Sequence, residues 1–287
     1  MTVIHPPESM KPRLMQLWNT CFAHDEDFCE FFFDRHFAPE KALAVTDGGD
    51  EVYAALHFFD GLYRDGSGAI HPAWYVYGVA TSPPHRKKGY ASLLLRQLIR
   101  DAREANIALL YLTSEVEAWH LYESVGFQRV AELSRTAFRA APAPSGLQWQ
   151  PCSLEKFKRL RGLYTASLAN VFLWEGRELE FFYSDLCRDG QVLCTTMDGR
   201  EYYAAVRLRD NELTVAETDF PRGSGHLLAE SIASRFGWNG SLYVHGRKDD
   251  FFSGSSVTGQ ENIYIGHILS VDGSAPSTEA YMNLLAD

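Results

Sequence analysis

The chain has 287 residues, of which 46% are hydrophobic and 22% are charged, and its formal net charge is −10 at pH 7. This length accommodates one large or two ordinary domains, and the negative charge argues against the phosphate-neutralising face that nucleic-acid binding requires. No apolar stretch is long enough to cross a bilayer, and the first residues lack a secretory apolar region, so we expect a soluble protein with no nucleic-acid or membrane partner.

The first half of the chain has the pattern of an α/β domain. Two helices are expected at residues 9–23 and 25–36, followed by strands at 42–46 and 52–59 that are joined by the turn "DGGDE". A third strand at 74–81 precedes a helix at 89–106 with leucines on one face and charged residues on the other. A strand at 107–112, a helix from 117 to about 124 and a strand from 127 complete a pattern that predicts a mixed sheet flanked by helices.

The second half repeats the first. Residues 30–60 and 180–210 align without a gap at an offset of 150, with 11 identities in 31 positions. A repeat of this length indicates a duplicated domain rather than a solenoid of short units. The segment "FRAAPAPSGLQW" at 138–149 has the composition of a linker, so we expect two tandem α/β domains at residues 1–142 and 143–287.

The five cysteines indicate a reducing compartment. Their number is odd and no two have C-x-x-C spacing, which favours buried thiols in a cytoplasmic protein and predicts no metal site.

An acidic cluster follows the first predicted helix. Asp25, Glu26 and Asp27 are either solvated carboxylates at a helix start, where the helix dipole favours them, or an acidic lip that attracts an amine.

One short segment concentrates positive charge in this acidic chain. In "VATSPPHRKKGYASLLL", residues 79–95, a strand end passes through two prolines and three cations into an amphipathic helix. Unpaired N–H groups at a helix start favour anions, and a glycine at residue 89 lets the backbone approach a ligand closely. The segment therefore predicts a site for phosphate oxygens.

The segments "TSPPHRKKGYA" and "AWHLYESVGF" together resemble the acetyl-CoA-binding half of the GNAT (GCN5-related N-acetyltransferase) superfamily. The "HRKKG" motif and the tandem arrangement further resemble the enhanced intracellular survival acetyltransferases, over about residues 1–270. Members of that group usually continue into a third, sterol-carrier-like domain. The resemblance implies two tandem GNAT-like domains, each a mixed twisted sheet flanked by helices, the second degenerate.

The resemblance also implies roles for individual residues. The main chain from residue 86 to 91 would hold the pyrophosphate of acetyl-CoA, and backbone groups near Val79 and Thr81 would pair with its pantetheine amides. The residues so implied in cofactor binding are Val79, Thr81, Arg86, Lys87, Lys88, Gly89, Tyr90, Ala91 and Ser92. Tyr122 would protonate the departing thiolate, since a phenol with a pKa near 10 is protonated at neutral pH. The alternative for Tyr122 is a core aromatic side chain.

The base that takes the acceptor's proton is less defined. Glu115 is a candidate, with a surface carboxylate that caps the following helix as its alternative; His85 and His120 are weaker candidates. Relatives that have the third domain use the terminal carboxylate of the chain, which would here belong to Asp287.

The second repeat reads "ETDFPRGSGHLLAESIASRF" where the first has its cation-rich loop. Its loop is shorter and Arg222 is its one cation, so we expect this domain to have lost the cofactor site.

The predicted function is an acetyl-CoA-dependent N-acetyltransferase acting on a primary amine of a small molecule or peptide. The acidic surface suggests a cationic acceptor. A non-catalytic acyl-CoA sensor or scaffold is the alternative, followed by a structural α/β protein, and a homo-oligomer is compatible with the sequence.

Overall fold

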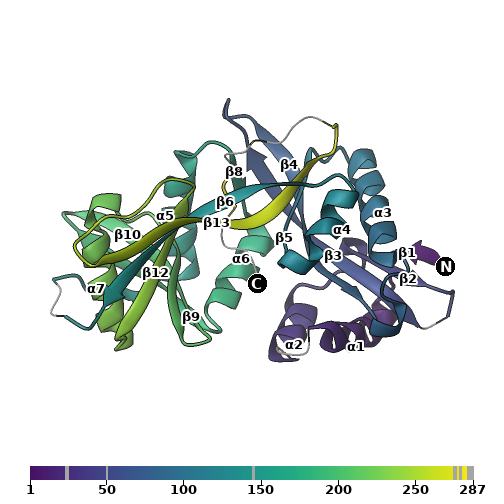
Figure 1. Ribbon diagram of the computed structural model, residues 1–287, viewed down its shortest axis with the longest axis horizontal. Helices are drawn as coiled ribbons and strands as arrows, with labels where there is room; N and C mark the ends of the chain where they lie inside the picture. Colours follow the sequence, from purple (N-terminus) through teal and green to yellow (C-terminus); the bar gives the residue numbers. More distant parts are fainter. Residues whose placement is uncertain (23–25, 50, 144–145, 274–276, 278–279, 283–287) are drawn as a thin grey trace. The chain divides into compact units, whose positions relative to one another are not determined.

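The computed structural model describes the chain except for residues 23–25, 50, 144–145, 274–276, 278–279 and 283–287. The chain forms two compact units. Unit 1 comprises residues 1–63, 70–129 and 266–276, and unit 2 comprises residues 64–69, 130–265 and 277–287. Each unit combines a sheet with helices (Figure 1). The assignment of 1–142 to a catalytic domain and of 143–287 to a degenerate domain stays a prediction.

Unit 1 is built on a mixed sheet with the strand order β1-β2-β3-β4-β5-β13. The strands are β1 (Thr2–Ile4), β2 (Ala42–Thr46), β3 (Val52–Arg64), β4 (Ile70–Thr81), β5 (Leu109–Thr113) and β13 (Val257–Ser270), of which the last residues belong to this unit. The helices are α1 (Lys11–Cys21), α2 (Glu26–Arg35), α3 (Tyr90–Glu104) and α4 (Trp119–Ser124), with short 3-10 turns at Glu8–Met10, Pro39–Lys41, Pro83–His85 and Val116–Ala118. β4 and β5 are parallel, whereas β5 and β13 are antiparallel.

The two faces of this sheet carry different cores because strand side chains alternate. Trp74 and Val76 of β4 join an aliphatic core with the leucines of α3 and with Tyr122 of α4. The intervening Tyr75 and Tyr77 join an aromatic core on the other face, which includes the following rings of α1, α2 and β3: Trp18, Phe28, Phe32, His57 and Phe59.

Unit 2 repeats this order of elements. Its strands are β6 (Gln128–Ala140), β7 (Gln150–Pro151), β8 (Val171–Leu173), β9 (Gly190–Met197), β10 (Arg200–Arg209), β11 (Glu212–Thr218), β12 (Gly240–Arg247) and the first part of β13. Its helices are α5 (Leu154–Ala166), α6 (Gly176–Leu186) and α7 (Gly225–Phe236), with a 3-10 turn at Arg222–Ser224. The described residues between β12 and β13 contain no helix, so α4 has no counterpart here.

The last strands of the two repeats are exchanged between the units. β6, the last strand of the first repeat, pairs with β12 in unit 2 through residues such as Leu242 and Phe138. The end of β13, the last strand of the second repeat, pairs with β5 in unit 1 through residues such as His267 and Leu112. Each unit therefore contains a strand from the other repeat.

The predicted elements exist, and several of their bounds were wrong. The first helix, expected at 9–23, begins as a 3-10 turn and ends at Cys21 among the described residues, and the second spans Glu26–Arg35. β3 continues five residues beyond the expected end at residue 59, and β4 begins four residues before the expected start at residue 74. The linker expected from residue 138 begins later, because β6 continues to Ala140.

The gapless repeat alignment also fails within one hairpin. Ala44 of β2 pairs with Ala55, whereas Cys194 of β9 pairs with Tyr203 rather than with Ala205, the residue 150 positions after Ala55. The turn explains this difference: β9 and β10 are joined by Asp198 and Gly199, both with positive φ, as in a two-residue hairpin. The first repeat has a longer turn at this place.

Candidate active site

β4 separates from β5 near its carboxyl end. The parallel pairing covers Ala73–Tyr75 of β4 and Leu109–Tyr111 of β5, and within these two fully described strands no pair extends further. β4 nevertheless continues to Thr81, so its last residues can offer backbone groups to an extended ligand. Val79 and Thr81, the two residues predicted to contact pantetheine, lie in this part and are half-buried.

Gly78 bends β4 at this place. Its φ of +57° lies in the left-handed region, and a Cβ atom there would lie 2.8 Å from Cη2 of Trp18 in α1. Only glycine fits this close approach between strand and helix. The bend therefore depends on the packing of Trp18 against the sheet.

The loop between β4 and α3 is the segment for which an anion site is predicted. Gly89 is the N-cap residue of α3 with φ +81°, and an added Cβ would meet no atom within 4 Å, so the space in front of it is open. Lys87 also has a positive φ, of 62°. As a glycine, Gly89 has no side chain with which to cap the first N–H groups of α3. A turn of this kind before a helix directs N–H groups at an anion.

The cations of this loop differ in their contacts. Arg86 donates from Nε to the Thr81 carbonyl at 3.3 Å, a carbonyl that Cys21 Sγ also approaches at 3.3 Å. Lys87 and Lys88 are exposed, and among the described residues neither forms an ion pair. These two ammonium groups are therefore available to a phosphate. Tyr90, Ala91 and Ser92 follow, half-buried, in the first turn of α3.

Aromatic side chains pack against one another at the loop between β4 and α3. The ring of His85 lies 4.3 Å from that of Tyr53 and 6.3 Å from that of Tyr90. Tyr53 in turn donates to Asp47 Oδ2 at 3.0 Å, and this hydrogen bond raises the pKa of Tyr53 to about 12. The backbone N–H of Ser82 donates to the Tyr53 carbonyl at 2.9 Å, which fixes the start of the loop to β3.

Tyr122 lies on the same face of the sheet as α3. Its side chain is 6% exposed within the aliphatic core of unit 1. Burial raises the pKa of Tyr122 to about 12, because the phenolate loses its hydration there. Tyr122 is thus a core aromatic side chain in the structure, and its role as proton donor to the thiolate stays a prediction.

The predicted base and acceptor residues are only partly described. Glu115 is exposed at the N-cap of the turn Val116–Ala118, and its backbone carbonyl, not its carboxylate, accepts from the Ala118 N–H at 3.0 Å. The capping role predicted for the Glu115 carboxylate was therefore wrong. Asp27 is exposed on α2. Asp25, the side chain of Glu26, and Asp287 lie outside the described residues.

His267 is a residue of this site that sequence reasoning missed. Its ring lies 5.6 Å from that of Tyr122 and 6.4 Å from that of Trp119, and its Nδ1 lies 3.3 Å from Ser114 Oγ. It is 0% exposed, and burial lowers its pKa. The one available signal was a lone histidine in the apolar stretch "IGHILSV" at the far end of the chain.

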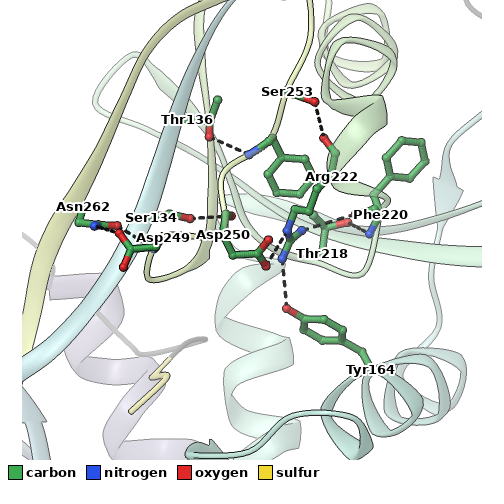
Figure 2. Close-up of polar contacts among 11 residues, drawn as sticks. Ser134, Thr136, Tyr164, Thr218, Phe220, Arg222, Asp249, Asp250, Ser253 and Asn262 are labelled. Carbon is green, nitrogen blue, oxygen red and sulfur yellow. Dashed lines mark hydrogen bonds and ion pairs between the residues drawn. The ribbon is translucent and has the colours of Figure 1, made fainter. Parts of the chain in front are cut away.

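The corresponding helix start in unit 2 is occupied by the chain itself. Figure 2 shows Arg222 between Asp250 and Tyr164: its Nε donates to Asp250 Oδ2 at 2.9 Å and its Nη2 to the Tyr164 hydroxyl at 3.4 Å. A Cβ added at Gly225, the first residue of α7, would lie 2.8 Å from the Ser253 carbonyl oxygen. An internal carboxylate therefore stands beside the cation, and the chain covers the helix start that a phosphate would need.

The described residues contain no group of three or more histidine, cysteine or acidic side chains placed to hold a metal ion. None of the described helices is long and apolar enough to cross a membrane.

Comparisons with known proteins agree with this geometry. Residues 3–130 match the model of the acetyltransferase (GNAT) domain. A search of curated proteins found no match to the sequence.

Solved structures share the fold across both units. A GCN5-related N-acetyltransferase from Kribbella flavida is similar with 15% identity and a TM-score of 0.68, over 94% of this chain and 72% of that one. Eis1 from Mycobacterium abscessus is similar with 13% identity and a TM-score of 0.66, over 95% and 74%. A putative acetyltransferase from Pyrococcus horikoshii has 12% identity and a TM-score of 0.60, over 99% and 94%. The predicted fold of two tandem α/β repeats is thereby confirmed.

Proposed function

We propose that the protein, whose residues 3–130 match the model of the acetyltransferase (GNAT) domain, transfers the acyl group of acetyl-CoA to a primary amine of a small-molecule or peptide acceptor. The observation that carries this proposal is the arrangement within unit 1. The open start of α3, with the exposed ammonium groups of Lys87 and Lys88 beside it, follows the end of β4, which is not paired with β5 there. The buried phenol of Tyr122 lies on the same face of the sheet.

The residues present fit acetyl-CoA. The open space before Gly89 and the uncapped N–H groups of α3 suit the pyrophosphate, and Lys87 and Lys88 would neutralise its charge. The unpaired end of β4 suits the amides of pantetheine at Val79 and Thr81. When bound, the ligand supplies a thioester that an amine can cleave.

Tyr122 stabilises the leaving thiolate. The amine nitrogen forms a bond to the acyl carbon while the carbon–sulfur bond breaks, and sulfur leaves with the electron pair. With the pKa of Tyr122 at about 12, full proton transfer to a thiolate whose thiol has a pKa of about 8.5 would be uphill by roughly 5 kcal/mol. We therefore assign Tyr122 a hydrogen bond to the developing thiolate, with the proton that finally neutralises the sulfur coming from the acceptor amine through a base.

The base and the acceptor remain proposals from the sequence. Glu115 is exposed and uncommitted to capping, which suits a carboxylate that takes a proton directly or through water. We propose a cationic acceptor, attracted by the net charge of −10 and by Asp25, Glu26 and Asp27.

We place the protein in the cytoplasm. Its cysteines are free thiols, and that compartment keeps thiols reduced.

The test is thiol release from acetyl-CoA with a panel of amines, including polyamines, aminoglycosides and arginine-rich peptides. Replacing Tyr122 by Phe should lower kcat by about 100-fold or more, the range for removal of one hydrogen-bond donor to a developing anion, and leave CoA affinity within about twofold. Tyr202→Phe is the matched control, because Tyr202 is a tyrosine of the same 6% exposure in the core of unit 2.

The outcomes separate the alternatives. An unchanged kcat in Tyr122→Phe removes the assigned role of Tyr122. Tight CoA binding without release by any amine favours a sensor or scaffold, and flat calorimetry with CoA removes the proposed function.

A further inference from the structure

We propose that His267 is the positioning residue for Tyr122, an inference that rests on the proposed function and extends it to a strand of the second repeat. His267 does not act on the substrate itself. Its imidazole holds the phenol ring of Tyr122 in the orientation from which the hydroxyl reaches the leaving sulfur.

The strand register places His267 in the layer that contains Tyr122. On β13, His267 pairs with Leu112 and Leu269 pairs with Leu110 of β5. Leu269 and Val271 belong to the aliphatic core with Tyr122. Because alternate strand residues share a face, His267 points into the same layer as those two side chains.

The contacts of His267 join three elements. Its ring lies 5.6 Å from the Tyr122 ring on α4 and 6.4 Å from the Trp119 ring on the same helix. Nδ1 lies 3.3 Å from Ser114 Oγ, just after β5. The imidazole is thus packed on one side by the helix that carries the phenol and hydrogen-bonded on the other to the residue that follows β5.

Tyr122 needs such a partner because its own helix is short. α4 has six residues, too few for an isolated helix to be stable in water. Two rings flank the phenol, Phe127 at 6.1 Å and His267 at 5.6 Å. Of these two, His267 is the one with a polar anchor outside α4, so it can fix the phenol relative to the sheet.

The charge state of His267 suits this role. Burial lowers its pKa, which keeps the imidazole neutral at pH 7. Two charged groups face His267: Glu123 on α4 raises the pKa of His267, and Arg129 on β6 lowers the pKa of His267. Glu123 and Arg129 form an ion pair with each other at 3.7 Å. Tyr122, the third titratable neighbour, stays protonated. Protonation of the ring at acidic pH would place a cation in an apolar layer beside the phenol, which disfavours the packed arrangement.

The first experiment measures turnover in three variants. His267→Ala should lower kcat by about 30-fold, within the range that a misplacement of about 1 Å produces, with CoA affinity unchanged within about twofold. His267→Asn keeps a polar group near the position of Nδ1 and should recover at least about a third of the wild-type kcat, whereas Ser114→Ala should lower kcat by about threefold through the lost anchor. His245→Asn, on β12 in unit 2, is the matched control for the loss of an imidazole.

The second experiment needs no acetyl-CoA. In protein with tyrosines labelled at the ζ-carbon, the NMR signal of Tyr122, assigned with Tyr122→Phe, should respond as the pH falls below the ordinary histidine pKa of about 6.5 and His267 becomes protonated. This response should be absent in His267→Asn and should persist in His245→Asn. If His267→Ala does not fold, His267→Asn and Ser114→Ala carry the test.

Two results would overturn the inference. One is a folded His267→Ala or Ser114→Ala protein with wild-type kcat, and the other is a Tyr122 signal whose acid response survives in His267→Asn. The second result does not depend on the proposed function, because the NMR measurement reports the contact even if no amine is acetylated.

Discussion

Replacing Gly78 by Ala should destabilise the protein more than the same change at another left-handed glycine. Gly78 has φ +57° and would bring a Cβ to 2.8 Å from Trp18 Cη2, whereas Gly237 has φ +61° and nothing within 4 Å of an added Cβ. The backbone cost of the left-handed conformation, about 1–2 kcal/mol, is common to both sites. Overpacking adds about 1–3 kcal/mol at Gly78 alone.

The measurement is urea denaturation of the two variants. We expect the free energy of unfolding to fall by about 2–5 kcal/mol in Gly78→Ala and by about 1–2 kcal/mol in Gly237→Ala. Adding Trp18→Phe to Gly78→Ala should recover part of the difference, because the smaller ring lacks the atoms that the Cβ would meet. Trp18 packs in the aromatic core, with its ring 5.0 Å from that of Phe32, so Trp18→Phe alone sets the baseline of this double-mutant cycle.

The reasoning is refuted if the two alanine variants lose the same stability within about 0.5 kcal/mol, the limit of additivity for independent sites. It is also refuted if the coupling between Gly78 and Trp18 is zero, because the clash would then not lie between these two side chains.

Two further predictions concern buried charge. Arg161→Met should lower the free energy of unfolding by about 3–5 kcal/mol, because it leaves Glu217 without its cation; Glu217 is 0% exposed and accepts from Arg161 Nε at 2.8 Å. The double variant with Glu217→Leu should regain most of this loss in the same denaturation assay, and an equal loss in the single and double variants would contradict the pairing. Burial lowers the pKa of His57 to about 3, so as the pH falls the unfolded state binds a proton before the folded state does. The stability that His57 contributes is therefore present above pH 6.5 and is lost as the pH falls toward 3. The denaturation midpoint of His57→Leu should depend less on pH in this window, and an unchanged pH dependence of the midpoint would show that other groups govern it.

The local part of the site was predictable from the sequence because local chemistry determines it. A strand end, a loop with Lys87 and Lys88, and a glycine at the helix start are consecutive, so the anion site follows from the order of residues. The repeat and its α/β order were likewise readable from periodicity. The structure then added the separation of β4 from β5, which no spacing reveals.

The missed strand end has a long-range cause. Asp60 and the glycine after it look like the end of a strand, yet β3 continues through them. Asp60 accepts from Lys41 at 2.6 Å and from Trp74 Nε1 at 2.9 Å, so residues distant in the chain satisfy this carboxylate within the sheet. Propensity alone does not include such partners.

His267 was missed for a related reason. It is 145 positions after Tyr122 in the chain and meets it only because the end of β13 pairs with β5. The sequence repeat indicated that residue 267 belonged with the second domain, and the exchange of strands is a property of pairing that periodicity does not encode.

This exchange makes the two gene halves interdependent. A polypeptide that stopped at the linker would lack the stretch Gly266–Ser270, leaving the hydrogen-bonding edge of β5 bare, and its own β6 would have no β12 beside it. Coexpression of two fragments could restore both pairings, whereas either fragment alone would expose an unpaired edge to aggregation. After duplication, neither copy could be deleted without removing a strand from the sheet of the other, which gives a reason for both repeats to be retained.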